Sequence, residues 1–188
     1  MPRVIILMGL PGSGKSTWAK GQVADVCSAD AYFDGPPGRR FEPRLLPEAH
    51  GECMRKFIDL CRHQNKPTLI VDNTNTTLVE LAPYLAVAAA YRHFVEIRHF
   101  VCSVMEANDR TMHDVPAEVL VRMERNLKET VTTMPPWWPR LLTHVTGDPS
   151  ASAAEAIFTR AKLVTDAFNV ELAADMDASR RRRLGVTS

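Results

Sequence analysis

Gly9-Leu10-Pro11-Gly12-Ser13-Gly14-Lys15-Ser16-Thr17 is the stretch that decides the fold. It matches the phosphate-binding pattern G-x-x-x-x-G-K-S/T at every fixed position. It directly follows the apolar run 4–8, which is typical of a strand buried on both faces. A chance match in a chain of this length is roughly a one-in-a-hundred event, because Gly makes up only about 7% of average sequences. The stretch therefore predicts a loop that binds the phosphates of a nucleoside triphosphate.

The residue types in this loop each have a chemical reason. Its glycines let the backbone curl so that successive N–H groups point at an anion. Lys15 reaches the β- and γ-phosphates, and the Ser16 hydroxyl is a ligand for the accompanying Mg²⁺. The expected ATP-binding residues are Gly9, Gly12, Ser13, Gly14, Lys15, Ser16 and Thr17.

The composition is that of an ordinary globular protein. The chain has 188 residues, of which 45% are hydrophobic and 24% are charged, and its net charge is +1. This balance does not demand a nucleic-acid partner, although it is compatible with a local basic groove. No apolar run reaches transmembrane length, and no signal peptide is visible. The four cysteines have no paired metal-ligand spacing and are interpreted as small buried hydrophobic residues in a reducing cytosol. We therefore expect a cytoplasmic protein without a membrane segment.

Apolar strands and amphipathic helices alternate along the rest of the chain. This alternation predicts an α/β fold of the P-loop NTPase, kinase-like type, with a parallel sheet, helices on both faces and a lid segment. We expect a P-loop kinase domain over 1–147 and a C-terminal helical extension over 148–188 that ends in a basic tail, Arg180–Arg183. The expected further strands are 23–28, 68–71, 94–101 and 140–147, and the expected helices are 17–22, 47–63, 80–91, one from Pro116 through Leu127, and 150–168.

Two aspartates follow expected strands. In open α/β sheets, ligands bind beyond the carboxyl ends of the strands. Asp30 comes after the second strand and is our candidate for a catalytic carboxylate. Asp72 comes after the third strand, which is the Walker-B-like position for a carboxylate that serves Mg²⁺. The alternative for either residue is a carboxylate that only caps a turn.

Arginines supply the remaining candidates. Small P-loop kinases need a lid arginine that reaches the transferring phosphoryl group, and Arg110 precedes Pro116 in a polar segment suited to this role. Arg39, Arg40 and Arg44 lie in a Gly- and Pro-rich loop after the second strand. They are candidate contacts for an anionic substrate, or else solvated loop charges.

The motifs together resemble a known family. Residues 9–18, Ser-Ala-Asp at 28–30, Asp-Asn-Thr-Asn at 72–75 and Arg110 before Val115-Pro116 resemble the polynucleotide 5′-hydroxyl kinase family, including the phage type. Phe-Glu-Pro at 41–43 and Ala-His at 49–50 make the chain still more similar to the related NEDD4-binding-protein-2 P-loop domains. The resemblance covers roughly 1–139. It implies that Asp30 is the general base toward an acceptor hydroxyl, and that Lys15 and Arg110 stabilise the transferring phosphoryl group.

The leading hypothesis is an ATP- and Mg²⁺-dependent kinase whose acceptor is a hydroxyl on a nucleic acid, with the 5′-hydroxyl end of DNA or RNA as the default. A hydroxymethyluracil base within DNA is a rival acceptor with the same donor chemistry. A kinase for a nucleoside or a sugar needs the same loop. A non-catalytic NTP-binding switch is the alternative from another class, but a switch needs neither the Asp30 base nor the Arg110 lid.

Overall fold

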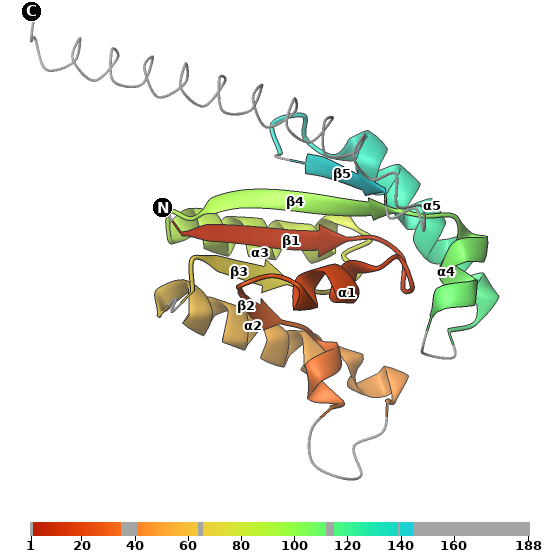
Figure 1. The fold of residues 1–188 in the computed structure, drawn as a ribbon, viewed down its shortest axis with the longest axis horizontal. Coiled ribbons are helices and arrows are strands. Elements are labelled where there is room, and N and C mark those ends of the chain that lie inside the picture. The colour runs from red at the N-terminus through yellow and green to blue at the C-terminus, as the bar shows by residue number, and fades with distance from the viewer. Residues whose placement is uncertain (1, 35–40, 64–65, 112–114, 139, 145–188) are drawn as a thin grey trace, which may run out of the picture. The chain divides into compact units, whose positions relative to one another are not determined.

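The computed structural model describes residues 2–34, 41–63, 66–111, 115–138 and 140–144, which belong to one compact unit, Met1–Val145. Strands and helices alternate along these residues (Figure 1). The strands are β1 (Arg3–Met8), β2 (Asp25–Cys27), β3 (Thr68–Val71), β4 (Phe94–Val101) and β5 (Arg140–His144). The α-helices are α1 (Lys15–Lys20), α2 (Leu46–Arg62), α3 (Leu78–Ala90), α4 (Val104–Arg110) and α5 (Ala117–Thr133), and the 3₁₀ helices are η1 (Asp30–Tyr32) and η2 (Pro43–Leu45).

The described strands form one parallel sheet in the order β2-β3-β1-β4-β5. β1 lies between β3 and β4, so the phosphate-binding loop leaves the sheet near the middle of its carboxyl edge. β1 is apolar without interruption because both of its faces are covered, and its residues from Val4 to Met8 are at most 3% exposed. The predicted α/β fold with a parallel sheet is therefore confirmed.

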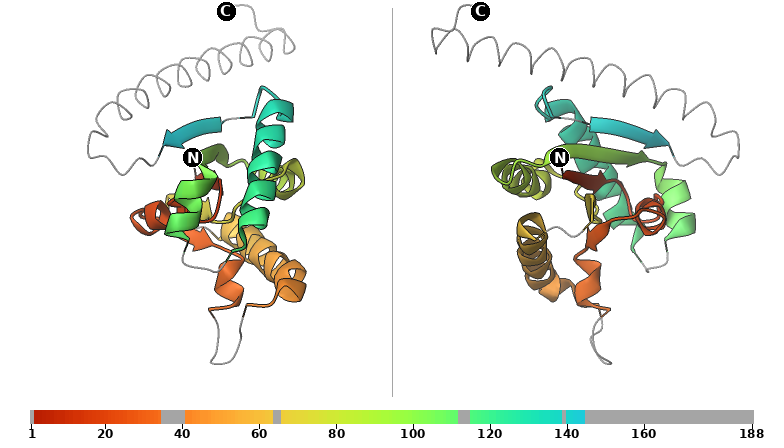
Figure 2. Two further views of the ribbon diagram at one scale, coloured as in Figure 1. Left: turned by 90° about the vertical axis from the view of Figure 1, so that its right-hand side faces the viewer. Right: turned by 60° about the vertical axis from the view of Figure 1, so that its left-hand side comes forward.

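Helices cover the two faces of the sheet unequally (Figure 2). One core cluster packs α2, α3 and α5 against alternate side chains of β1, such as Val4 and Ile6. A smaller cluster on the opposite face packs Ala19 of α1 against Ile5 and Leu7. Alternation along a strand sends successive side chains to opposite faces, which explains the division. No helix among the described residues is long and apolar enough to cross a membrane.

The boundaries agree with the sequence predictions best in the interior of the sheet. β3 and β4 match the predicted ranges residue for residue. β2 is shorter than the predicted 23–28, because it is an edge strand that pairs only with β3. The first helix begins at Lys15, inside the phosphate-binding motif, and ends before Gly21, so the predicted range 17–22 was two residues late.

Capping explains two further differences. α3 begins before the predicted residue 80 because the Thr77 hydroxyl and the Glu80 carboxylate form a capping box. Ser103 and Glu106 form a second capping box, and the predicted polar lid segment consequently begins as the helix α4. The predicted extension 148–188, its boundary at 147 and its basic tail lie outside the described residues.

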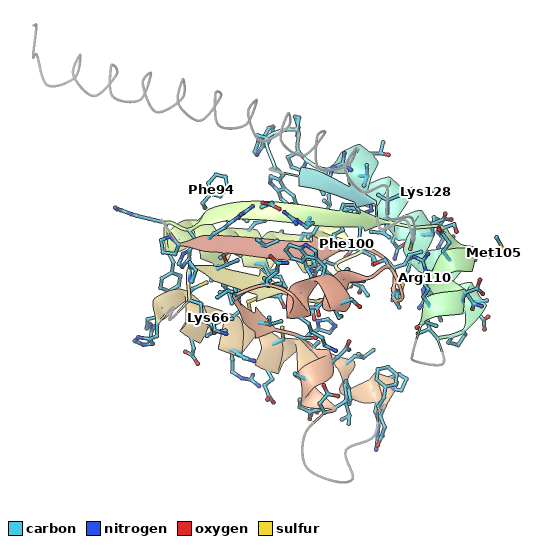
Figure 3. The ribbon with its side chains drawn as sticks, viewed as in Figure 1. Lys66, Phe94, Phe100, Met105, Arg110 and Lys128 are labelled. Carbon is cyan, nitrogen blue, oxygen red and sulfur yellow. The ribbon has the colours of Figure 1, made fainter. Side chains whose placement is uncertain are left out.

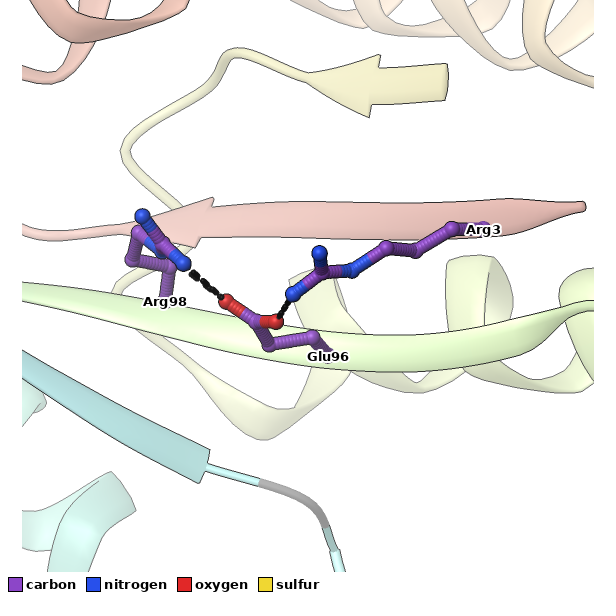
Figure 4. Close-up of polar contacts among 3 residues, drawn as sticks. All are labelled: Arg3, Glu96 and Arg98. Atoms are coloured by element: carbon purple, nitrogen blue, oxygen red, sulfur yellow. Dashed lines mark hydrogen bonds and ion pairs between the residues drawn. The ribbon is translucent and has the colours of Figure 1, made fainter. Parts of the chain in front are cut away.

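An ion-pair network centred on the buried Glu96 joins β1 and β4 (Figure 4). The Glu96 carboxylate is paired with Arg3 on one side and with Arg98, at 2.7 Å, on the other. Arg98 in turn lies over the Trp18 ring of α1, 4.2 Å from its centroid. A buried carboxylate is tolerated only with such partners, since its desolvation is otherwise costly. The network holds α1, and with it the end of the phosphate-binding loop, against the sheet.

Candidate active site

Two glycines shape the phosphate-binding loop. Gly9 has a φ of 146°, and a Cβ there would lie 2.6 Å from the backbone oxygen of Phe100. Gly12 has a φ of 76°, and its added Cβ would collide with the carbonyl oxygen of Ala107 in α4. Both positions therefore require glycine. Gly12 serves a second purpose, because it lets the loop pack directly against α4.

The Lys15 ammonium is held inside this loop. Its Nζ donates hydrogen bonds to the backbone oxygens of Gly9, at 3.0 Å, and Leu10, at 2.6 Å, and to the Ser13 hydroxyl, at 3.2 Å. Burial lowers the pKa of Lys15 to about 8, and the negative charges of Asp72 and Asp30 partly oppose this. A buried cation surrounded by curled backbone is suited to attract phosphate oxygens.

Ser16 and Asp72 form the second part of the site. Asp72 follows the carboxyl end of β3, near the Ser16 hydroxyl. Burial raises the pKa of Asp72, and the nearby charge of Asp30 adds to the rise, whereas the Ser16 hydroxyl and the charge of Lys15 oppose it. This oxygen pair fits Mg²⁺, which takes one or two protein oxygens together with substrate phosphates. Across the described ranges, no group of three or more His, Cys, Asp or Glu residues could hold a metal ion by itself.

Asp30 lies at the beginning of η1, beyond the carboxyl end of β2. It is exposed, whereas Lys15 is 6% exposed. Its backbone N–H donates to the Ser28 hydroxyl at 3.2 Å, and η1 has no side-chain cap. The charge of Asp30 acts on both Lys15 and Asp72. The two strand-end aspartates and the loop lysine are thus brought together, as parallel strands with a common carboxyl edge require.

Arg110 is the last residue of α4 and lies where this helix meets the phosphate-binding loop (Figure 3). Its guanidinium is 3.8 Å from the Glu106 carboxylate, one turn earlier. Burial raises the pKa of Cys102, and the positive charges of Lys15 and Arg110 both oppose that rise. Because both cations oppose the rise in the pKa of Cys102, Arg110 and Lys15 lie near the same thiol, and Arg110 is therefore close to the loop.

Of the predicted substrate arginines, Arg44 lies within the described residues. Arg44 is exposed and forms an ion pair with Glu42 at 2.6 Å. Arg39 and Arg40 lie outside the described residues. Next to Asp30 the structure instead contains a cluster of aromatic rings, which the sequence analysis missed. The ring centroid of Phe33 lies 5.2 Å from that of Tyr32 and 5.1 Å from that of Phe41, which is 60% exposed.

Two buried asparagines were also missed. Asn73 is 7% exposed and Asn75 is 2% exposed, in the segment directly after β3. The available signal was a run of small polar residues immediately after a fully apolar strand, which is unusual because buried amides need specific partners.

Comparison with known proteins decides the family. Residues 4–130 match the family model described as AAA domain. The chain belongs to the AAA domain family. Human NEDD4-binding protein 2 is a relative of this AAA domain protein, 29% identical over 138 residues, which is 69% of the chain. The chain spans only 8% of the length of that relative. The resemblance to NEDD4-binding-protein-2 P-loop domains that the motifs predicted is confirmed.

Solved structures place this AAA domain protein among P-loop kinase folds. A chain from the Pnkp1/Rnl/Hen1 RNA repair complex superimposes with a TM-score of 0.60 at 21% identity, covering 79% of this chain and 53% of that one. A gluconokinase from Sinorhizobium meliloti gives 0.57 at 15% identity, covering 90% and 97%. A sugar kinase from Janibacter gives 0.51 at 16% identity, covering 84% and 94%. These superpositions establish the fold. At such low sequence identities they leave the acceptor of the phosphate undecided.

Proposed function

We propose that this domain is an ATP- and Mg²⁺-dependent kinase that transfers the γ-phosphate to a hydroxyl group on a nucleic acid, with the 5′-hydroxyl end of a polynucleotide as the acceptor. The observation that carries this proposal is the convergence of Lys15, the Ser16–Asp72 pair and Asp30 at one edge of the sheet. A binding switch needs the first two elements only. The exposed carboxylate beside them is what a transferase adds, because a hydroxyl nucleophile must be oriented and deprotonated.

The proposed transfer assigns one role to each of these residues. The acceptor oxygen attacks the γ-phosphorus, the bond from phosphorus to the β–γ bridging oxygen breaks, and ADP leaves with that oxygen. The Asp30 carboxylate takes the proton of the acceptor hydroxyl, while Lys15 and Arg110 stabilise charge on the transferring group. Ser16 and Asp72 would hold Mg²⁺, which neutralises charge on the phosphate oxygens when it is bound.

The aromatic cluster beside Asp30 favours a nucleic-acid acceptor over a sugar. Nucleobases stack on exposed aromatic side chains, and each such contact is worth about 1–3 kcal/mol. Phe41 offers a ring that is 60% exposed, with Phe33 behind it. An open-chain polyol such as gluconate has no π-face that could stack on such a ring. The likeness to a chain of the RNA repair complex is consistent with this choice, whereas the gluconokinase and the sugar kinase represent the alternative.

Transfer of labelled γ-phosphate to an acceptor panel tests the proposal. The panel contains DNA and RNA oligonucleotides with 5′-hydroxyl ends, the same oligonucleotides with 5′-phosphates, DNA with hydroxymethyluracil, free nucleosides, and gluconate. We expect label on the 5′-hydroxyl oligonucleotides and none on their 5′-phosphorylated forms. Label on blocked DNA that contains hydroxymethyluracil would identify a base kinase instead. Label on gluconate or nucleosides alone would identify a small-molecule kinase, and tight ATP binding without transfer would favour the switch.

A matched pair of variants examines the aromatic cluster. Phe41→Ala is expected to raise KM for an oligonucleotide about tenfold without changing KM for ATP, since one stacking contact is lost. Phe94→Ala removes another exposed ring, 41% exposed, at the amino end of β4 and away from Arg110 (Figure 3), and is expected to change neither constant. Equal effects of the two substitutions would remove the aromatic argument for a nucleic-acid acceptor.

A further inference from the structure

A buried polar segment, residues 72–76, links the separate parts of the candidate site. It follows β3 directly, and Asn73, Asn75 and Thr76 are 7%, 2% and 3% exposed. Buried amides are costly unless their hydrogen-bonding groups find partners, so the partners of these residues indicate what the segment holds in place.

Asn73 contacts the acceptor side of the site, by which we mean the part around Asp30. Its Oδ1 accepts a hydrogen bond of 2.8 Å from the backbone N–H of Ala29, the residue immediately before Asp30. Its Nδ2 donates to the Tyr84 hydroxyl of α3, at 3.2 Å, and to Cys53 Sγ of α2, at 3.5 Å. The side chain therefore ties the backbone at Asp30 to two long helices.

Asn75 contacts the donor side of the site, by which we mean the phosphate-binding loop and the end of β1. Its Nδ2 donates a hydrogen bond of 2.7 Å to the backbone oxygen of Leu7, near the end of β1. The neighbouring Thr74 oxygen accepts a hydrogen bond of 2.9 Å from the N–H of Gly9, the first residue of the phosphate-binding loop. Asn75 has a φ of 44°, which asparagine tolerates better than most residues. These contacts fix where the loop leaves the sheet.

We propose that Asn73 and Asn75 are positioning residues with separate tasks, Asn73 setting the proposed base Asp30 and Asn75 setting the phosphate-binding loop. This inference rests on the proposed kinase function. β2 is an edge strand that pairs with one neighbour, β3, over Asp25, Val26 and Cys27, so the Asn73 contact with Ala29 adds a tether next to Asp30. A misplacement of about 1 Å at a reacting group can cost about a hundredfold in rate, which makes such a tether matter.

Paired substitutions separate the two tasks. Asn73→Ala is expected to lower kcat for transfer about tenfold or more, with the Kd for ATP unchanged within about twofold. Asn75→Gly keeps the positive φ and is expected to raise the Kd for ATP about tenfold, because the loop is no longer held in its binding conformation. Calorimetry gives the ATP affinity and single-turnover transfer gives the rate. Equal changes in both constants for both variants would contradict separate tasks.

Two controls distinguish positioning from general packing. Tyr84→Phe removes one of the two acceptors of Asn73 Nδ2 and leaves the Ala29 contact in place, so it is expected to lower the melting temperature while transfer stays near the wild-type rate. Asn73→Asp keeps a side-chain oxygen for the Ala29 N–H and is expected to retain more transfer than Asn73→Ala. If Asn73→Asp and Asn73→Ala are equally impaired, the Ala29 contact does not carry the effect. Asn73→Leu, which has a similar size but no acceptor for the Ala29 N–H, serves as the test variant if Asn73→Ala does not fold.

A double-mutant cycle with Asp30→Asn completes the test. If Asn73 acts through Asp30, Asn73→Ala lowers transfer in the wild-type background and adds little in the Asp30→Asn background. The same loss in both backgrounds would overturn the assignment. Failure of the wild type to label any acceptor would refute the kinase proposal itself. The ATP affinities of Asn73→Ala and Asn75→Gly would then still support or overturn the donor-side assignment.

Discussion

The donor side and the acceptor side of the candidate site are built in different ways. On the donor side, Lys15 is 6% exposed and its ammonium is surrounded by backbone oxygens and a hydroxyl of its own loop. On the acceptor side, Asp30 is exposed and Phe41 is 60% exposed. The enclosed side is suited to one small anionic group that many enzymes share. The open side leaves room for a large acceptor, so the difference indicates that substrate choice resides in the exposed residues.

The largest expected loss of transfer comes from a substitution on the donor side. Lys15→Ala removes the cation next to the β- and γ-phosphates, and we expect transfer to fall by about 10³-fold or more. Single-turnover transfer of labelled phosphate at saturating acceptor measures the loss. Transfer at a rate near that of the wild type would mean that this loop is not the phosphate-binding site.

A smaller effect on the acceptor side sharpens the comparison. Asp30→Asn keeps the shape of the side chain but removes its basicity, so transfer is expected to drop by about 10² while ATP affinity stays within a few-fold. Asp72→Asn is the control carboxylate, and raising the Mg²⁺ concentration is expected to restore part of its activity. If Asp30→Asn transfers phosphate normally, Asp30 is only a turn residue.

Arg110 lies at the boundary between the two sides. Its contact with the phosphoryl group is expected to strengthen in the transition state, so Arg110→Ala should lower kcat by about tenfold to a hundredfold with a smaller change in ATP affinity. Kinetics and calorimetry on the same preparation give both quantities. Losses of equal size would mean that Arg110 only binds ATP.

The smallest expected effect is a pH dependence of the donor side. Burial lowers the pKa of Lys15 to about 8 in the free protein, so its ammonium loses its proton as the pH rises through that value. Bound phosphates favour the charged form, and ATP affinity is therefore expected to fall by at most about tenfold per pH unit above 8. Calorimetric titrations between pH 7 and pH 10 test this, with Lys15→Ala as the control that should lack the dependence.

The same contrast explains what the sequence could predict. The loop residues 9–17 and the strands β3 and β4 are local patterns of apolar runs and glycines, and these were predicted closely. The meeting of Asp30 and Asp72 followed from the rule that parallel strands share a carboxyl edge. The start of α4 was missed although Ser103 and Glu106 carried its capping-box signal.

These local patterns could not predict contacts between segments that are distant in the sequence. Asn73 finds partners in Ala29, Cys53 and Tyr84, which come from three different parts of the chain. The pairing of Glu96 with arginines on two strands depends equally on register. Neither periodicity nor composition predicts such contacts. The residues that hold the site together could therefore be identified only from the structure.

The asparagine hydrogen bonds to Ala29 and Leu7 end on main-chain atoms, and this has a consequence for mutational tolerance. A backbone carbonyl is present at position 7 whatever residue occupies it, and a backbone N–H is present at position 29 for every residue except proline. Substitutions there that respect the available space leave the bonds intact, whereas position 73 must keep a side-chain acceptor and position 75 a side-chain donor. In a saturation-mutagenesis library selected for transfer, we therefore expect varied residues at positions 7 and 29 and few residue types at positions 73 and 75. Such one-sided pairs would escape methods that infer contacts from the joint variation of two positions.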